Sequence, residues 1–226
     1  MQTKYEFLRR TAAVIAAFFT LTFTGCGQTP KSPGSFPVSG VVSETTAQSG
    51  QETAGVSEGG SFTIHFIDVG QADSTLITCD GHSMLIDGGN ADDSNLVYSV
   101  LQRETEGHLD YVIGTHAHED HIGGLSGAFE ADTADVTFCP VTEYDSKAFR
   151  NFKARADERG GGITVPAVGD TFTLGEATVT VVTVNSVPED TNNTSIVIRI
   201  VYGDTSFLFT GDAEQETEEK ILESGQ

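Results

Sequence analysis

The stretch THAHEDHIGGL, residues 115–125, holds three of the six histidines of the 226-residue chain. His116 and His118 are separated by one residue, so in extended backbone at the end of a strand both side chains project to the same side and can reach one metal ion. Asp120 and His121 follow at the turn into IGGL, where a carboxylate and a third imidazole can face a second ion. Imidazole and carboxylate together suit zinc, manganese or iron. We therefore expect a metal site; the alternative is a histidine-rich loop that binds no metal.

The segments before this stretch predict alternating strands and helices. SFTIHFIDV, STLITC and SMLIDGG are typical of three successive strands joined by short turns, which indicates an antiparallel start to a sheet. NLVYSVLQRE has apolar residues at helical spacing, and LDYVIGTH is typical of a buried strand. This order of strand, helix and strand predicts an α/β domain. The other histidines, His65, His82 and His108, are interpreted as packed or solvated side chains.

Downstream of the histidines, DSKAFRNFKARADERG predicts an amphipathic helix. Four β-rich runs follow, and AEQETEEKILE predicts a last helix. The first of these two helices carries four of the few cations: Lys147, Arg150, Lys153 and Arg155. They form either a solvated helix face or a contact for an anionic substrate.

The first 25 residues have the composition of an export signal rather than of a folded domain. Lys4, Arg9 and Arg10 form a basic segment, and TAAVIAAFFTLTF is an apolar run of 13 residues, too short to span a bilayer comfortably. FTGC then ends in Cys26 and resembles the lipobox of bacterial lipoproteins, in which the signal is cut before a lipidated cysteine. A lipid on Cys26 would anchor the chain to the outer face of a bacterial membrane, and without it the protein would be secreted.

The amino-acid composition also distinguishes a linker, residues 27–60, from a single folded domain, residues 61–226. Residues 27–60 are rich in Ser, Gly, Thr, Pro and Gln and lack apolar periodicity, which predicts a flexible linker. Residues 61–226 are long enough for one sizeable core. Cys79 and Cys139 show no metal-ligand spacing and are either core residues or disulfide partners. The formal net charge of −21 excludes the basic profile of a typical nucleic-acid binder, so metal ions or a local patch would have to hold a polyanionic substrate.

Several of these segments together resemble a known family. THAHEDHIGGL matches the His-x-His-x-Asp-His signature of the metallo-β-lactamase superfamily. FIDVGQADSTLI, MLIDGG and NNTSIVIRIVYGDTSFLFTGDAE, in this order, resemble more narrowly the hydrolase domain of ComEC-like competence proteins. The resemblance covers nearly all of residues 61–226 and implies an αββα sandwich with its metals at one edge between two sheets. It also implies a further strand and helix after TGD, which this sequence lacks. The chain is therefore expected to be a fragment of a longer protein or to have a weak or empty second metal site.

The superfamily pattern implies a role at the metals for five residues. His116 and His118 would bind the first ion, and Asp120 and His121 the second. Asp212, in FTGDAE, matches the aspartate that bridges the two ions. The resemblance thus implies one or two divalent ions, zinc or manganese, with Asp120 and Asp212 as the catalytic carboxylates.

Three more residues are expected to support the site. Asp87, in LIDGG, matches an aspartate close to the metals and is expected to orient a ligand histidine. Asp68 belongs, with Gln71 and Asp73, to the motif DVGQAD that resembles the opening of ComEC-like domains. Asn193 precedes SIVIRI, where most superfamily members have a histidine and ComEC-like domains have asparagine. The first ion would therefore have one strong ligand fewer.

These features predict a metal-dependent hydrolase that acts outside a bacterial cell on phosphodiester bonds, through water that the ions activate. The ComEC-like resemblance favours nucleic acid as the substrate, whereas the acidic charge favours a smaller phosphodiester or a cell-wall component. The missing histidine ahead of SIVIRI disfavours a β-lactamase. The alternative function is a lipid-tethered binding module that has the same fold and little or no activity.

Overall fold

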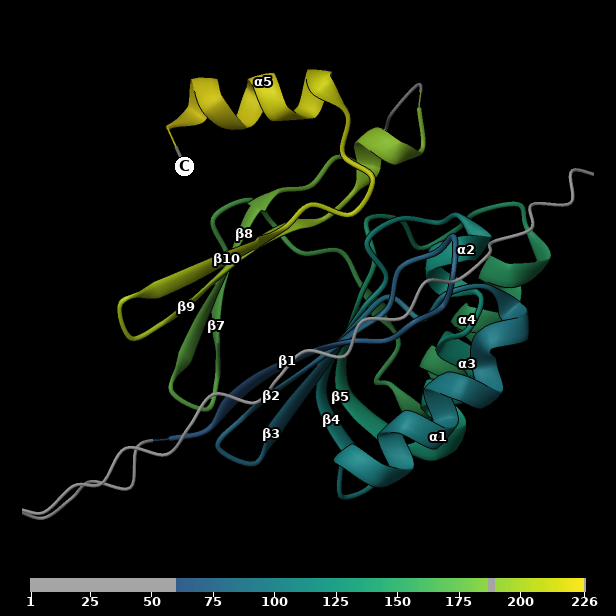
Figure 1. Cartoon of the computed structure of the whole chain (residues 1–226). Coiled ribbons are helices and arrows are strands. Elements are labelled where there is room, and N and C mark those ends of the chain that lie inside the picture. Colours follow the sequence, from purple (N-terminus) through teal and green to yellow (C-terminus); the bar gives the residue numbers. More distant parts are fainter. Residues whose placement is uncertain (1–59, 187–189, 226) are drawn as a thin grey trace, which may run out of the picture. The chain divides into compact units, whose positions relative to one another are not determined.

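The computed structural model describes residues 60–186 and 190–225, which form two facing β-sheets with their helices (Figure 1). The predicted export signal, the lipidated Cys26 and residues 27–59 of the predicted linker lie outside the described residues. No helix within the described ranges is long and apolar enough to cross a membrane.

Sheet A has six strands in the order β1-β2-β3-β4-β5-β6. The pairs β1–β2 and β2–β3 are antiparallel, which confirms the predicted start of the sheet, and β3 to β6 run parallel. Asp80 and Gly81 form the two-residue turn between β2 and β3, and both have positive φ, as the tight hairpin turns that match strand twist require. The strands are β1 (Phe62–Phe66), β2 (Thr75–Cys79), β3 (His82–Ile86), β4 (His108–Ile113), β5 (Thr133–Phe138) and β6 (Ile163–Thr164).

The structure has a second sheet, sheet B, formed by the four strands that follow β6. Helices cover the face of sheet A that points away from sheet B (Figure 1). The predicted strand, helix and strand unit is confirmed by β3, α1 and β4, since β3 and β4 pair in parallel. The two short helices after β4, and strands β5 and β6, were not predicted from the sequence. The elements of this layer are η1 (Ala91–Asp93), α1 (Ser94–Glu104), α2 (Glu119–Ile122), α3 (Leu125–Ala131) and α4 (Lys147–Arg159).

Helix α4 confirms the predicted amphipathic helix. The Ser146 side chain caps it by accepting a hydrogen bond from the Phe149 backbone N–H at 3.0 Å. Its apolar side, with Phe149 and Phe152 as the large residues, is buried against sheet A. Three of its cations form ion pairs with surface carboxylates, namely Arg150 with Asp145, Lys153 with Asp157, and Arg155 with Glu130 and Glu158. These ion pairs agree with a solvated helix face, and a contact with an anionic substrate stays a prediction.

Sheet B has four antiparallel strands in the order β10-β9-β8-β7. It packs its inner face on sheet A, and the core between the sheets includes Ile77, Met84, Val179 and Ile198. Helix α5 follows β10 on the sheet B side of the molecule (Figure 1). The layers of helix and sheet confirm the predicted α/β class. The elements are β7 (Thr171–Leu174), β8 (Ala177–Thr183), η2 (Asn192–Thr194), β9 (Val197–Tyr202), β10 (Thr205–Phe209) and α5 (Gln215–Ser224).

Cys79 and Cys139 are core residues rather than disulfide partners. Both thiols are free and fully buried. Cys79 packs in the core between the two sheets, whereas Cys139 packs in the core between sheet A and its helices. The two cysteines therefore belong to different layers of the fold.

Candidate metal centre

The histidine cluster lies just after β4, at the end of the sheet where the parallel strands finish. Gly114 and Thr115 lead from β4 into the cluster, and His118 is the N-cap of α2. The glycines that follow allow close backbone packing: a Cβ on Gly124 would lie 1.8 Å from the Gly88 carbonyl oxygen. The Gly88 N–H also donates to the His121 carbonyl at 2.7 Å. The LIDGG loop after β3 and the HEDHIGG segment therefore hold each other in place.

His116 and His118 face each other as the first candidate ligand pair. His116 Nε2 and His118 Nδ1 are 3.1 Å apart, and their rings meet edge to face at 76°. Two nitrogens bound to one zinc ion at tetrahedral positions lie roughly 3.3 Å apart. The separation therefore fits one shared ion.

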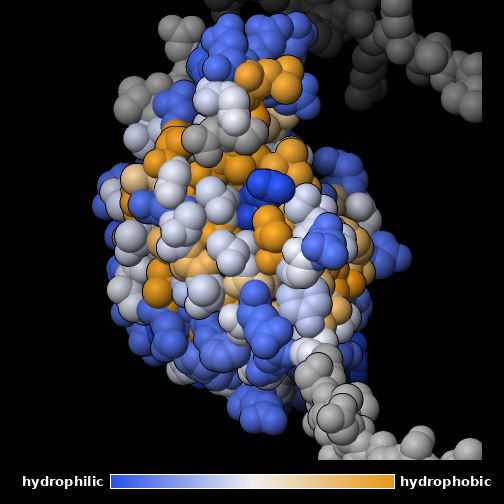
Figure 2. Space-filling view, turned by 90° about the vertical axis from the view of Figure 1, so that its left-hand side faces the viewer, coloured by the Kyte–Doolittle hydropathy of each residue, from blue (hydrophilic) through white to orange (hydrophobic). Residues whose placement is uncertain are grey.

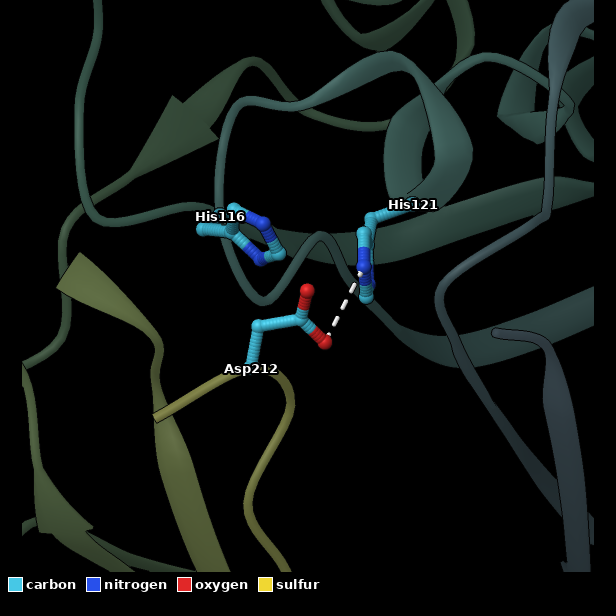
Figure 3. A group of neighbouring side chains, drawn as sticks. All are labelled: His116, His121 and Asp212. Carbon is cyan, nitrogen blue, oxygen red and sulfur yellow. Dashed lines mark ion pairs between the residues drawn. The ribbon is translucent and has the colours of Figure 1, made fainter. Parts of the chain in front are cut away.

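His121 and Asp212 form the second part of the candidate centre (Figure 3). His121 Nε2 lies 3.3 Å from Asp212 Oδ1, and one ligand atom each of His116, His121 and Asp212 lies within 4.8 Å of the others. His121 is 2 % exposed, whereas the Asp212 side chain, on the loop after β10, is 40 % exposed. Sheet B thus delivers a carboxylate to imidazoles held by sheet A. Asp212 can reach both histidines, as a bridging ligand must.

Asp87 fixes the orientation of His121. Its backbone has φ 56°, in the left-handed region that non-glycine residues rarely adopt, and its side chain is buried. Asp87 Oδ1 accepts the Thr115 N–H at 2.8 Å, and Oδ2 accepts the Thr115 hydroxyl at 2.7 Å. Oδ2 also lies 2.9 Å from His121 Nδ1. The carboxylate holds the Nδ1 side of the ring, so the Nε2 side is turned toward Asp212.

The two buried imidazoles have opposite charge preferences. Burial, with the charges of the neighbouring His121 and His118, lowers the pKa of His116 to about 3. Burial also opposes charge on His121, but the hydrogen bond to Asp87 and the charges of Asp87, Asp212 and Asp120 outweigh it and raise the pKa of His121 to about 9. His116 is therefore neutral and ready to bind a metal at neutral pH, whereas His121 must lose a proton first.

Asp120 and Asp68, both named from the sequence, belong to none of the candidate ligand groups. Asp120, just beside the cluster, accepts a hydrogen bond from Gln71 Nε2 at 3.4 Å. Asp68 is exposed, and its Oδ1 accepts the Gly70 N–H at 3.4 Å. The structure does not bring Asp68 to the cluster.

Asn193, which was expected to support the site, lies in η2 and contacts the start of α5. Its Oδ1 accepts the Glu214 N–H at 3.2 Å and the Thr217 hydroxyl at 2.7 Å, so it satisfies donors at the N-terminus of α5. These hydrogen bonds hold the segment after Asp212 at the start of α5. Asn193 does not replace a histidine ligand at the first ion.

The structure places a further carboxylate at the centre that was not selected from the sequence. One ligand atom each of Asp73, Asp87 and His121 lies within 4.8 Å of the others. Asp73 stands in the same DVGQAD motif as Asp68, and its position two residues before the buried strand β2 was the available signal.

A cleft of about 190 Å³ opens beside these carboxylates. Asp73, Asp87 and Thr115 line its polar side, and Phe66, Leu208 and Phe209 are among the residues of its apolar side. Phe66 is 70 % and Leu208 55 % exposed, since β1 and β10 are edge strands of their sheets within the described residues. Figure 2, seen from the side of the β9–β10 hairpin, shows hydrophobic side chains at the surface in the middle of this face, between hydrophilic regions.

The remaining histidines are surface residues away from the centre. His82 Nδ1 lies 2.7 Å from Asp110, and His108 Nε2 lies 3.3 Å from Asp135, with roughly half of each imidazole exposed. His65 lies on the edge strand β1. Their placement agrees with the interpretation as packed or solvated side chains.

The family model described as the metallo-β-lactamase superfamily matches residues 67–224, which include every candidate ligand named above. The chain belongs to the metallo-β-lactamase superfamily. This superfamily includes metal-dependent hydrolases, and the candidate ligands of this chain have the donor types that a metal centre uses. A search of curated proteins found no match.

Several solved structures resemble this chain at low identity. A Cronobacter sakazakii metallo-β-lactamase with a HARLDQ motif is 14 % identical, with a TM-score of 0.49 over 71 % of each chain. The metallo-β-lactamase fold protein YhfI from Bacillus subtilis is 23 % identical, with a TM-score of 0.40 over 62 % of this chain and 54 % of its own. CmlA, a diiron β-hydroxylase from Streptomyces venezuelae, is 16 % identical, with a TM-score of 0.44 over 71 % of this chain and 32 % of its own.

Proposed function

We propose that this protein is a metal-dependent hydrolase that cleaves phosphodiester bonds on the outside of a bacterial cell. The observation that carries the proposal is the meeting of His116, His121 and Asp212 within 4.8 Å, from loops of two different sheets. His118 lies against His116 at ligand spacing. Such a convergence of imidazole and carboxylate groups suits one or two divalent ions, zinc or manganese.

Each residue of the centre has a distinct role in this proposal. His116 and His118 would hold the first ion, His121 and Asp120 the second, and Asp212 would serve as a ligand to both. When bound, the ions would make water a nucleophile near neutral pH and polarise the scissile phosphoryl group. Asp87 keeps the imidazole of His121 in one orientation by hydrogen bonding to its Nδ1 side.

The substrate we favour is a small phosphodiester, with nucleic acid as the second candidate. The chain has a formal net charge of −21, and the cations of α4 are largely paired with carboxylates. A polyanion would therefore depend on the metal ions for attraction. The cleft of about 190 Å³ beside the centre, with its exposed Phe66 and Leu208, accommodates an apolar or aromatic group next to a phosphate. The ComEC-like segments of the sequence support nucleic acid.

The proposed location follows from the N-terminal sequence. A basic segment, an apolar run and FTGC precede the domain, and a lipid on Cys26 would anchor the protein to the outer face of the membrane. Residues 27–59 would then act as a tether that lets the hydrolase domain reach its substrate.

A second candidate function is a binding module with little activity. It is favoured by Asn193, whose side-chain oxygen serves the N-terminus of α5 and so does not supply a third ligand to the first ion. Among the described residues, His116 and His118 are the nitrogen ligands placed for that ion.

Metal content and hydrolysis together test the proposal. The purified protein should carry one or two transition-metal ions and hydrolyse bis-p-nitrophenyl phosphate, with nitrocefin as a lactam control. His116→Ala should remove both metal and activity, whereas His65→Ala, which removes an imidazole from the edge strand β1, should change neither. A wild-type protein that binds metal but hydrolyses neither phosphodiester nor lactam would favour the binding module. A folded wild type that binds no metal contradicts the hydrolase and also favours the binding module.

A further inference from the structure

The loop between β1 and β2 is attached to the metal centre through the backbone of Asp73. The Asp73 N–H donates to the Asp120 carbonyl at 3.3 Å, and the Asp73 carbonyl accepts the Gly89 N–H at 2.8 Å. Asp73 is thereby joined both to the HEDH segment and to the LIDGG loop. Its side chain is placed by the same elements that place His121 and Asp87.

The carboxylate of Asp73 is available for a ligand, whereas that of Asp87 is not. Both Asp87 oxygens already accept hydrogen bonds from Thr115, and one of them also lies against His121 Nδ1. Within residues 60–186 and 190–225, the Asp73 carboxylate has no hydrogen bond and no ion-pair partner. Asp73 nevertheless lies within 4.8 Å of His121 by their ligand atoms, and it lines the cleft beside the centre.

We propose that Asp73 is an additional ligand of the second metal ion, and that this ion is manganese. The inference rests on the proposed metal centre and extends it. Asp73 and Asp212 each have a ligand atom within 4.8 Å of one on His121. Together with Asp120, which the superfamily pattern implies as a ligand, they would give the second position three carboxylates and one imidazole. Oxygen-rich sets of this kind favour manganese, whereas a position with two imidazoles, such as that of His116 and His118, favours zinc.

This arrangement has a structural consequence for the substrate. Asp73 and Asp87 form part of the wall of the cleft of about 190 Å³, whereas His116 and His118 are not among its lining residues. A phosphodiester in the cleft would therefore lie beside Asp73. Loss of Asp73 should weaken binding of the second ion and leave the first in place.

Asp68 offers a matched control for Asp73. It belongs to the same loop, carries the same charge and is exposed like Asp73. It differs in that its carboxylate accepts the Gly70 N–H and belongs to none of the candidate ligand groups. Asp68→Asn and Asp73→Asn thus each remove one negative charge from the same loop. Asp73→Asn removes it at the centre, and Asp68→Asn removes it away from the centre. The backbone bonds of Asp73 do not involve its side chain, so Asp73→Asn is expected to fold. Equal thermal melts of the metal-free proteins check this, and Asp73→Glu retains a carboxylate as a second variant.

The experiment titrates Mn²⁺ into the metal-stripped full chain by calorimetry and follows the bound ions by electron paramagnetic resonance. Wild type and Asp68→Asn should bind two Mn²⁺ ions and show spin coupling between them. Asp73→Asn should lose the coupled signal and bind the second ion at least about tenfold more weakly, with the first unchanged. Asp73→Glu should recover part of the loss.

Each other outcome has a definite meaning. Two ions bound by Asp73→Asn with wild-type affinity, or a wild type that binds at most one Mn²⁺, overturns the assignment of Asp73. An equal loss in Asp68→Asn would show a general charge effect and overturns it as well. If Asp73→Asn alone loses the second ion while wild type cleaves no phosphodiester, the ligand assignment stands and the proposed hydrolase activity fails.

Discussion

The buried pair of His121 and Asp87 should make the stability of the metal-free protein fall as the pH rises above 6.5. Each side chain is 2 % exposed, and Nδ1 and Oδ2 are 2.9 Å apart. The pKa of His121 is raised to about 9, against about 6.5 in an unfolded chain. A histidine whose pKa is higher in the folded state contributes stability that is complete below 6.5 and lost as the pH passes through 9.

The free energy of unfolding should fall by about 3 kcal/mol as the pH rises from 6.5 to above 9, since each unit of pKa difference corresponds to about 1.4 kcal/mol. His116 acts in the opposite sense below this window. Its pKa is lowered to about 3, so its contribution is present above pH 6.5 and is lost as the pH falls toward 3. The metal-free protein should therefore be most stable near pH 6.5, as far as these two groups determine it.

Asp87→Asn isolates the His121 contribution. Asparagine tolerates the positive φ of this position but carries no charge to hold the imidazolium. Urea unfolding in chelator, at half-unit steps from pH 6.5 to 9.5, should show that the variant is less stable at pH 6.5 and loses little more as the pH rises. Asp110→Asn serves as the control, because it removes a carboxylate from the half-exposed His82 pair, which is worth little. Parallel curves for wild type and Asp87→Asn would refute the reasoning.

Three further predictions concern the metal and the packing. Because His121 keeps its proton up to about pH 9, binding of the second ion at pH 7 should release about one proton, and affinity should rise with pH; calorimetry in buffers of different ionisation enthalpy measures this. Gly124→Ala should destabilise the protein by about 3 kcal/mol or prevent folding, since its Cβ would lie 1.8 Å from the Gly88 carbonyl oxygen; urea unfolding measures the loss. Asn193→Ala should cost about 1 kcal/mol and increase hydrogen exchange in α5, because the Glu214 N–H loses its acceptor.

Each of these predictions has a control in the chain. The proton release should disappear in His121→Ala along with the second ion. Gly203→Ala introduces left-handed strain of about 1 kcal/mol without a clash, so it should cost much less than Gly124→Ala. Asn95→Ala removes an exposed amide from α1 and should leave exchange in α5 unchanged. Equal effects of either control and its partner would contradict the mechanism given.

The sequence predicted those elements whose periodicity is local. Helix α1, helix α4 and the hairpin of β2 and β3 were all found, because apolar spacing and turn residues define them without reference to the rest of the chain. Helices α2 and α3 were missed, since IGGLSGAF has the glycine content of a turn. The structure uses Gly123 and Gly124 for contact with the LIDGG loop and the residues after it, which lie far away in sequence. Only the tertiary packing explains those glycines.

In the metal centre, too, the local pattern predicted some residues, and others depend on tertiary structure. Spacing alone indicated His116, His118 and His121, while Asp212 came from the resemblance and lies 3.3 Å from His121. The sequence did not indicate that Asp73, rather than Asp68, has a ligand atom within 4.8 Å of one on His121, because both acids stand on one loop and the path of that loop decides their distances. The role of Asn193 depends on where α5 begins, which no local pattern specifies.

The separation of the two cysteines into different cores provides the protein with two natural reporters of opening. Cys79 lies between the sheets and Cys139 between sheet A and the helices, and burial raises the pKa of both thiols, that of Cys139 to about 12. A thiol reagent can label either one only when its own layer opens. The two labelling rates, read by mass spectrometry on the unmodified sequence, would show whether the helices leave the sheet before the sheets part, or whether the domain opens in one step.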